Sequence, residues 1–439
     1  MSVIEEKVFN RDIGVFGLTM LGVGATIGAG VFVLLGDATA ITGPSVIIAF
    51  IFNFFLALAI AMHYGEMAAM FPVEGGGFSF VEEAFGGSAY YVGWLIWMGN
   101  MAYASFSASA FALYMTSGTI IPALPVAVIT FLIFTAVNFS GITRVVKVEK
   151  LVTALLIGML VIFIFRGAII TDVSTYQNMF PNGVLALLPA TSLVFLCYIG
   201  FETITTISAE VKEPKITIPK ALIGAVIISG ILYTSFAFVF AGAVSVGDIS
   251  NPETALLQFF ATDIMRELLL FAAALATLST LNIALMAASR NAYALARDSF
   301  LPKTFSKVSK KDVPINAIIL TAVICLVLIL SEGATAIAEL SNFAYMLVVS
   351  MVCLSVLALR KRCADRERAY AVPLFPYITY FGIITPLILI PFLGTHALLI
   401  GAGWLIIGFL FYNIWRSQAF RESWNNHIGN IDPRLRCEE

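Results

Sequence analysis

The stretch Gly22–Gly36, GVGATIGAGVFVLLG, places five glycines within an apolar segment that is long enough to cross a membrane. Glycine weakens a helix, and unpaired backbone groups are tolerated in the middle of a bilayer only where they line a cavity or bind a ligand. The stretch therefore predicts an interrupted helix with a binding site at the interruption. Close packing between helices is the alternative interpretation, because Gly24 and Gly28 have the GxxxG spacing.

The composition of the whole chain is that of a membrane protein. Of its 439 residues, 60% are hydrophobic and only 12% are charged, which is more apolar surface than a soluble protein of this size can bury. About 20 apolar residues cross the ~30 Å hydrocarbon layer, so the sequence predicts an all-α integral membrane protein with twelve transmembrane helices. The predicted segments are 13–36, 43–64, 88–117, 122–140, 150–170, 184–207, 219–245, 265–296, 314–331, 335–359, 374–394 and 397–416.

The distribution of lysine and arginine predicts the orientation of these segments. If both termini are cytoplasmic, all of the 25 Lys and Arg residues except Arg166 and Arg266 lie on the cytoplasmic side, as the positive-inside rule requires. We therefore expect a multi-pass protein of the cell (plasma) membrane with a cytoplasmic N-terminus (1–12) and a cytoplasmic C-terminal tail (417–439). The basic run RKRCADRER, Arg360–Arg368, is interpreted as a cluster that faces membrane lipid headgroups, so no nucleic-acid partner is needed to explain it.

A second interruption is predicted in the sixth segment, LVFLCYIGFETITTISAEV (193–211), which has Gly200 and Glu202 in its middle. Interrupted helices at matching positions of two halves indicate a secondary transporter built from inverted repeats, with the substrate between them. The expected architecture is a five-plus-five inverted repeat, with residues 13–170 as the first repeat and 184–359 as the second. The helices in 374–416 would be peripheral.

The connection between the second and third segments reads FPVEGGGFSFVEEAFGG (71–87). Its apolar and acidic residues predict a short interfacial helix, with a flexible loop as the alternative. The phosphate-binding pattern GxxxxGK[ST] is absent from the chain, so the sequence does not support ATP-driven transport.

Four motifs together resemble the amino acid-polyamine-organocation superfamily, and they occur in the expected order over about the first 320 residues. The sixth-helix motif is most similar to that of the cationic amino acid transporter branch. The motifs are TIGAGVF (Thr26–Phe32), EGGGFSFVEEAFG (Glu74–Gly86), IGFETITTISAEVKEPKITIPKAL (Ile199–Leu222) and SRNAYALARDSFLP (Ser289–Pro302).

The resemblance implies where a free amino acid would bind. Its carboxylate would be held by backbone N–H groups around Gly28, Ala29 and Gly30, at the positive end of a half-helix. Its ammonium would meet carbonyl groups near Thr26, Ile27 and residues 196–199. Neither charge can enter hydrocarbon without such partners.

Selectivity for the amino acid side chain is expected from residues that face the two interruptions. Asn100 serves either as a substrate contact or as a bridge between helices. Ala284 and Leu196 stand where arginine-agmatine exchangers of the superfamily have aromatic residues, so stacking of an arginine side chain is not expected here. The full set of candidates is Ile96, Asn100, Tyr103, Leu196, Tyr198, Ile199, Gly200 and Ala284.

The coupling ion, H⁺ or Na⁺, is left open by the sequence. Glu202 is a candidate for proton coupling, or else a hydrated structural carboxylate. Proton-coupled relatives carry a lysine in the fifth helix where this chain has Leu156, which argues against a lysine-based mechanism. Ser279 and Thr280 offer hydroxyls for sodium, although such hydroxyls often bond their own helix. Exchange without a coupling ion is the third possibility.

The charged turn after the sixth helix, which contains Glu210 and Lys220, is expected to help close the inward gate. No cofactor or metal site is expected, and the oligomeric state cannot be inferred.

The predicted function is that of a permease, a secondary active transporter that moves amino acids by alternating access. The alternatives are a polyamine or organic-cation carrier, and an amino-acid-binding receptor or channel. An enzyme is not expected, because the three histidines (His63, His396 and His427) are scattered and no nucleophile–base or metal spacing is present.

Overall fold

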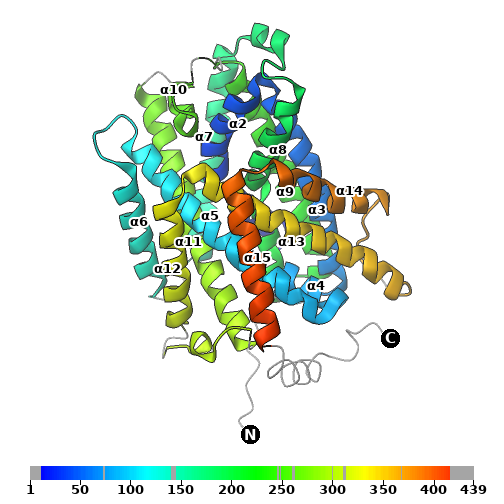
Figure 1. Ribbon diagram of the computed structural model, residues 1–439. Helices are drawn as coiled ribbons and strands as arrows, with labels where there is room; N and C mark the ends of the chain where they lie inside the picture. Colours follow the sequence, from blue (N-terminus) through cyan, green and yellow to red (C-terminus); the bar gives the residue numbers. More distant parts are fainter. Residues whose placement is uncertain are drawn as a thin grey trace.

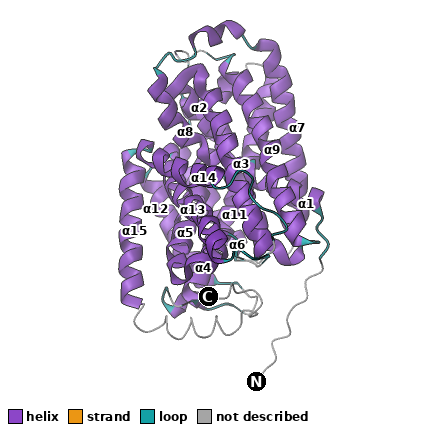
Figure 2. Ribbon diagram, turned by 90° about the vertical axis from the view of Figure 1, so that its right-hand side faces the viewer, coloured by secondary structure: helices purple, strands orange, loops and turns teal. Residues whose placement is uncertain are grey.

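The computed structural model describes residues 11–72, 75–139, 145–244, 247, 249–259, 263–298, 300–309, 313–366 and 368–415. The described chain consists of helices and loops without a β-sheet (Figures 1 and 2). Most of the N-terminal segment 1–12, the whole tail 417–439, His427, and Glu74 of the second motif lie outside the described residues.

Each predicted segment overlaps one helix or one interrupted helix. Seven helices of the described chain are long and apolar enough to cross a membrane, and four shorter apolar helices accompany them. The helices are α1 (Val15–Thr26), α2 (Ala29–Thr42), α3 (Val46–Met70), α4 (Gly77–Phe85), α5 (Ala89–Thr116), α6 (Ala123–Asn138), α7 (Val145–Ile170), α8 (Leu187–Val194), α9 (Pro214–Ala241), α10 (Leu256–Phe259), α11 (Asp263–Arg297), α12 (Ile315–Ser331), α13 (Ala334–Arg362), α14 (Tyr377–Leu389) and α15 (Thr395–Trp415).

Short 3₁₀ helices complete the fold where the chain bends. Three of them matter for the sites described below: η5 (Phe195–Tyr198), η6 (Phe201–Glu210) and η8 (Pro252–Thr254). The helix α4 confirms that the connection after α3 forms a short helix.

The core of the molecule is built from long helices that lie side by side. The helix α5 packs against α11 and α13, and α3 packs against α9. Large apolar side chains are buried along these contacts, whereas α6, α7, α12 and α15 also expose leucine, isoleucine and phenylalanine on their outer faces. Exposed apolar bands on long helices are what a lipid solvent requires.

We refer to the two ends of the bundle as they stand in Figure 1. The upper end carries α10, and the lower end carries α4 and the C-terminal end of α15. In the turned view of Figure 2, α15 forms one edge of the molecule, and α1 and α7 lie at the other.

Candidate functional site

The first interruption separates α1 from α2. The helix α1 ends at Thr26, and Gly28 has an extended backbone (φ −127°, ψ −155°) before α2 begins at Ala29. No side chain caps the N-terminus of α2, so its first amide groups have no partner within the helix. Such amides, at the positive end of a helix dipole, attract a carboxylate.

The second interruption separates η5 from η6. Ile199 is extended, and Gly200 has a φ of 126°, which is a conformation that favours glycine. A Cβ at this position would also collide with the carbonyl oxygen of Ala25 in α1. Both the backbone conformation and the available space therefore require glycine at position 200.

The two interruptions lie against each other. Gly200 approaches Ala25, and a Cβ on Gly30 would lie 3.3 Å from both Cα and Sγ of Cys197 in η5. The structure thus brings together the predicted backbone residues of both breaks, and all of them are buried. These residues are Thr26, Ile27, Gly28, Ala29, Gly30, Leu196, Ile199 and Gly200.

Tyr103 on α5 faces the first interruption. A Cβ on Gly28 would lie 2.9 Å from the Tyr103 Oη and would collide with the hydroxyl of Thr280 on α11. Tyr103 is only 5% exposed, and its Oη has no hydrogen-bond partner among the described residues. A buried hydroxyl without a partner costs about 1–3 kcal/mol, which a ligand at this place would recover by bonding to it.

Tyr233 on α9 is a contact that the sequence analysis did not identify. Its hydroxyl donates a hydrogen bond to the carbonyl oxygen of Thr26 at 2.8 Å. The Thr26 carbonyl, which is predicted to bind the substrate ammonium, therefore already uses one of its two lone pairs. A lone tyrosine in an apolar helix carries no motif, so the sequence offered no signal for this contact.

Other predicted side chains are engaged elsewhere. The Tyr198 hydroxyl donates to the carbonyl oxygen of Phe50 on α3 at 2.9 Å, so it serves packing against α3. The Asn100 amide nitrogen donates at 3.0 Å to the carbonyl oxygen of Ile96, one turn earlier in its own helix. Ala284 is buried on α11.

Glu202 caps the second interruption. Its Oε2 accepts a hydrogen bond from the Gly200 N–H at 2.8 Å, and the residue is partly buried. This contact supports a structural role and also places the carboxylate directly beside the break.

The residues considered for ion coupling differ in their surroundings. The Thr280 hydroxyl donates to the carbonyl oxygen of Ala276 in its own helix at 2.9 Å, and its neighbour Ser279 is partly buried. Leu156 is buried on α7. Within the described part of the chain, no group of three or more His, Cys, Asp or Glu side chains is placed to hold a metal ion.

The charged turn after η6 is joined to the start of α1 through backbone groups. Ile13 N–H donates to the Glu210 carbonyl at 3.2 Å, and Lys212 N–H donates to the Ile13 carbonyl at 3.0 Å, which forms a parallel bridge between Ile13 and Val211. Among the described side chains, neither Glu210 nor Lys220 takes part in an ion pair. A gating role for these two charges stays a prediction.

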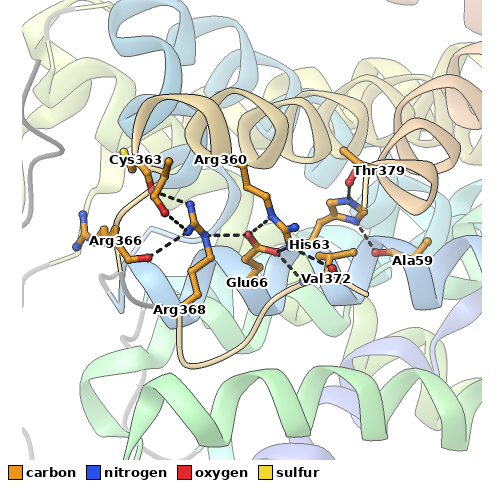
Figure 3. Close-up of polar contacts among 10 residues, drawn as sticks. Ala59, His63, Glu66, Arg360, Cys363, Arg366, Arg368, Val372 and Thr379 are labelled. Carbon is orange, nitrogen blue, oxygen red and sulfur yellow. Dashed lines mark hydrogen bonds and ion pairs between the residues drawn. The ribbon is translucent and has the colours of Figure 1, made fainter. Parts of the chain in front are cut away.

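A second polar region lies at the lower end, around Glu66 of α3 (Figure 3). Glu66 is fully buried, and Arg360 binds it with two nitrogens, Nε at 2.8 Å and Nη2 at 2.5 Å. The Val372 N–H donates to the same carboxylate at 2.7 Å, and Arg368 Nε lies 3.4 Å from it. We call Glu66, Arg360, Arg368 and Val372 the Glu66 cluster.

The arginine-rich segment folds inward, contrary to the expectation that it faces lipid headgroups. Besides the Glu66 contacts, Arg362 donates to the Ala84 carbonyl at 2.7 Å, and Arg366 donates to the Met70 carbonyl at 3.2 Å. The physical reason is that α3 continues beyond the predicted segment 43–64 and includes Glu66, whose buried charge requires cationic partners.

His63 lies one turn before Glu66 in α3 and makes further polar contacts (Figure 3). Its Nδ1 lies 2.7 Å from the Ala59 carbonyl oxygen and its Nε2 lies 2.9 Å from Thr379 Oγ1 at the start of α14. Because a carbonyl only accepts, Nδ1 carries the proton of the neutral ring.

Interrupted helices persist inside a bilayer only where the freed backbone is buried in protein or lines a cavity, and membrane transporters place their binding sites there. The fold and the paired breaks therefore define a multi-pass membrane transport protein. The chain belongs to the amino acid permease family, whose model matches residues 13–425. It is an amino acid transporter of the amino acid-polyamine-organocation superfamily, and not an enzyme.

The relatives include transporters with different named substrates. The branched-chain amino acid permease BcaP of Bacillus subtilis is 28% identical over 93% of both chains. The methylthioribose transporter of the same organism is 25% identical, over 85% of this chain and 86% of the relative. Cationic amino acid transporter 4, vacuolar, of Arabidopsis thaliana is 28% identical, over 80% of this chain and 63% of the relative.

Proposed function

We propose that this permease carries a zwitterionic amino acid by alternating access, with the substrate held between the two interruptions. The observation that carries the proposal is the uncapped N-terminus of α2, which lies beside the unpartnered hydroxyl of Tyr103. Amides and a hydroxyl suit a carboxylate. The carbonyl groups of Thr26, Ile27 and residues 196–199 are the proposed partners of the ammonium. Those of Thr26 and Leu196 already accept one hydrogen bond each, from Tyr233 and Ile199, and keep a second lone pair.

The proposed architecture has twelve spans. Residues 13–170 and 184–359 form two inverted repeats, and 374–416 form two peripheral helices. The protein lies in the cell membrane with both termini in the cytoplasm. The two breaks support this arrangement, because they occur in the first helix of each proposed repeat and lie against each other.

The proposed substrate has a neutral, apolar side chain. Leu196, Ile199 and Ala284 are buried and uncharged, and the one carboxylate at the break, Glu202, is engaged by Gly200. A cationic side chain would meet mostly apolar groups here, with Glu202 as its one described counter-charge beside the break. The name of the BcaP relative, a branched-chain amino acid permease, agrees with this class of substrate.

The proposed coupling ion, H⁺ or Na⁺, acts through the residues beside the breaks. Glu202 is the proposed site for a proton, and the hydroxyls of Ser279 and Thr280 are the proposed site for sodium. Uptake into proteoliposomes under a pH gradient alone and under a sodium gradient alone separates these two routes. Equal uptake without either gradient, driven by internal amino acid, would identify exchange instead.

The test of the proposed function begins with a thermal-shift panel of the twenty amino acids and of common polyamines on the purified protein. Counterflow of the best ligand in proteoliposomes then distinguishes a carrier from a receptor or channel. We expect stabilisation by a branched or small apolar amino acid and none by its decarboxylated amine. Stabilisation by polyamines alone would contradict the proposal.

The site itself is tested with a pair of glycine variants. Gly28→Ala places a Cβ against Tyr103 and Thr280 and should lower the affinity at least about tenfold, or ~1.4 kcal/mol. Gly158→Ala is the matched control, because a Cβ there meets no atom within 4 Å. Equal affinities of the two variants would place the substrate elsewhere.

A further inference from the structure

A polar cavity lies at the upper end of the molecule, away from the two interruptions. Its volume is about 410 Å³, which is within the range of small-ligand sites. The end of α5, the turn that follows it, η8, α10 and the start of α11 surround the cavity; α10 is labelled at this end in Figure 1. Its lining residues are Leu113, Thr116, Ser117, Gly118, Ser250, Asn251, Thr254, Leu257, Gln258 and Arg266.

Arg266 is the single charged residue in this lining. It is partly buried, yet among the described residues it forms no hydrogen bond or ion pair. Partly buried arginines are usually paired, because their five donors are costly to leave unmatched away from bulk water. The guanidinium is therefore available to an anionic ligand.

The turn after α5 is shaped to let the guanidinium approach it. Gly118 has a φ of 77°, and a Cβ there would lie 3.3 Å from Arg266 Nη2. Glycine thus satisfies the backbone conformation and also leaves room beside the charge. Thr116 and Ser117 also line the cavity. The Thr116 hydroxyl donates to the Ala112 carbonyl at 2.8 Å, so Ser117 is the one of the two that adds a neutral donor.

The nearby carboxylate of Glu253 is directed away from the cavity. Its Oε1 lies 3.2 Å from the Thr335 hydroxyl on α13, which donates more closely, at 2.6 Å, to Asp37. Its neighbours Asn251 and Thr254, by contrast, line the cavity. The loop therefore turns its acid toward α13 and its neutral polar groups toward Arg266. No carboxylate is among the described residues that line the cavity with this positive charge.

We propose that this cavity is a second binding site for the amino acid, in which Arg266 holds the carboxylate before the substrate reaches the interruptions. This inference rests on the proposed function. A guanidinium with adjacent hydroxyls matches a carboxylate with two hydrogen bonds. An inorganic anion such as chloride offers the same charge without that geometry, and the test separates the two.

The test is equilibrium dialysis of the purified full-length protein with the radiolabelled amino acid that the thermal-shift panel identifies, in chloride-free buffer. The wild type should bind two amino acids per chain, and Arg266→Gln should bind one. Arg166→Gln is the matched control, because it removes an exposed arginine of α7 and should still bind two. In uptake assays Arg266→Gln should raise KM about tenfold and leave the maximal rate unchanged, as expected for loss of one charged contact.

Three outcomes would overturn the inference. If Arg266→Gln still binds two amino acids, Arg266 belongs to neither site. If the wild type binds only one, the protein has a single site. Both outcomes leave the proposed function intact. Tight binding of radiolabelled chloride that the amino acid does not displace would assign the cavity to an inorganic anion. A wild type that binds none of the twenty amino acids would instead refute the proposed function.

Discussion

The two polar regions inside this apolar bundle differ in how completely their groups are paired. In the Glu66 cluster, both carboxylate oxygens are engaged by Arg360, and Val372 and Arg368 add further contacts. At the interruptions, the N-terminus of α2 has no cap and the Tyr103 hydroxyl has no partner. The paired groups stabilise the fold, and the unpaired groups are those that we propose for ligand binding.

This difference also separates the elements involved. The Glu66 cluster joins α3 to the C-terminal end of α13 and to the segment between α13 and α14 (Figure 3). The interruptions join α1, α2, η5 and η6 to α5 and α11. Variants in the two regions should therefore affect different quantities, stability in the first and affinity in the second.

The largest expected effect is on stability, from Glu66→Ala. Removing the carboxylate leaves Arg360 and Arg368 partly buried without a counter-charge, which costs on the order of 3–5 kcal/mol. Thermal unfolding of the purified protein measures the loss. Lys361→Ala, an exposed residue of the same segment, should change stability by less than about 0.5 kcal/mol. Similar melting temperatures for the two variants would break the comparison.

Tyr103→Phe should have opposite effects on stability and affinity. It removes an unpaired buried hydroxyl, so the ligand-free protein should gain about 1 kcal/mol, while amino acid affinity falls about tenfold. Tyr198→Phe is the control: its hydroxyl is bonded to Phe50, so that variant should lose about 1 kcal/mol of stability and keep its affinity. Thermal unfolding with and without ligand measures both. A Tyr103→Phe variant that loses stability would mean that its hydroxyl is structural.

Glu82 on α4 offers a carboxyl without an arginine pair. Burial, with smaller contributions from Asp298 and Glu83, raises its pKa from 4.5 to about 7. The folded state then holds a proton that the unfolded state releases, so stability should fall as pH rises from 4.5 to 7 and stay level above it. The fall should be on the order of 1 kcal/mol, because the group is partly exposed to water.

The measurement is the melting temperature of the wild type and of Glu82→Gln between pH 5 and pH 8. The variant should lose this part of the pH dependence, because glutamine does not titrate. The same slope in both proteins would assign the dependence to another group.

The smallest effect is expected from Asn100→Leu, one turn from Tyr103 on α5. The Asn100 amide nitrogen is bonded within its own helix, so its loss should change stability by about 0.5 kcal/mol and leave affinity within about twofold. Ligand-dependent thermal unfolding checks both values. A tenfold loss of affinity would mean that Asn100 also contacts the substrate, so that the binding region continues along α5.

Much of the fold was predictable because membrane helices are encoded locally. Apolar runs gave the helix positions, and the glycines at 28 and 200 marked both interruptions. A Cβ on Gly28 would collide with Thr280, and Gly200 has a φ of 126° and lies against Ala25. The motif resemblance indicated the family. Tyr103 was predicted as a site residue, and the structure places it beside Gly28.

The remaining contacts depend on pairs that are distant in sequence. Glu66 and Arg360 are 294 positions apart, and no local pattern in the sequence predicts that arginines of the basic run bind a buried carboxylate. The bond from Tyr233 to Thr26 is of the same kind. The bond from the Tyr198 hydroxyl to Phe50 on α3 likewise depends on tertiary packing, and the place of Tyr198 at the substrate site stays a prediction.

The short bridge between Ile13 and Val211 has a kinetic consequence. Two backbone hydrogen bonds join the segment before α1 to the segment after η6. Moving one segment without the other must therefore break both bonds, at a cost of about 1 kcal/mol each. We expect the two segments to move together, so fluorescent labels on either segment should show a single relaxation time. Two separate relaxation times would show that the two segments move independently.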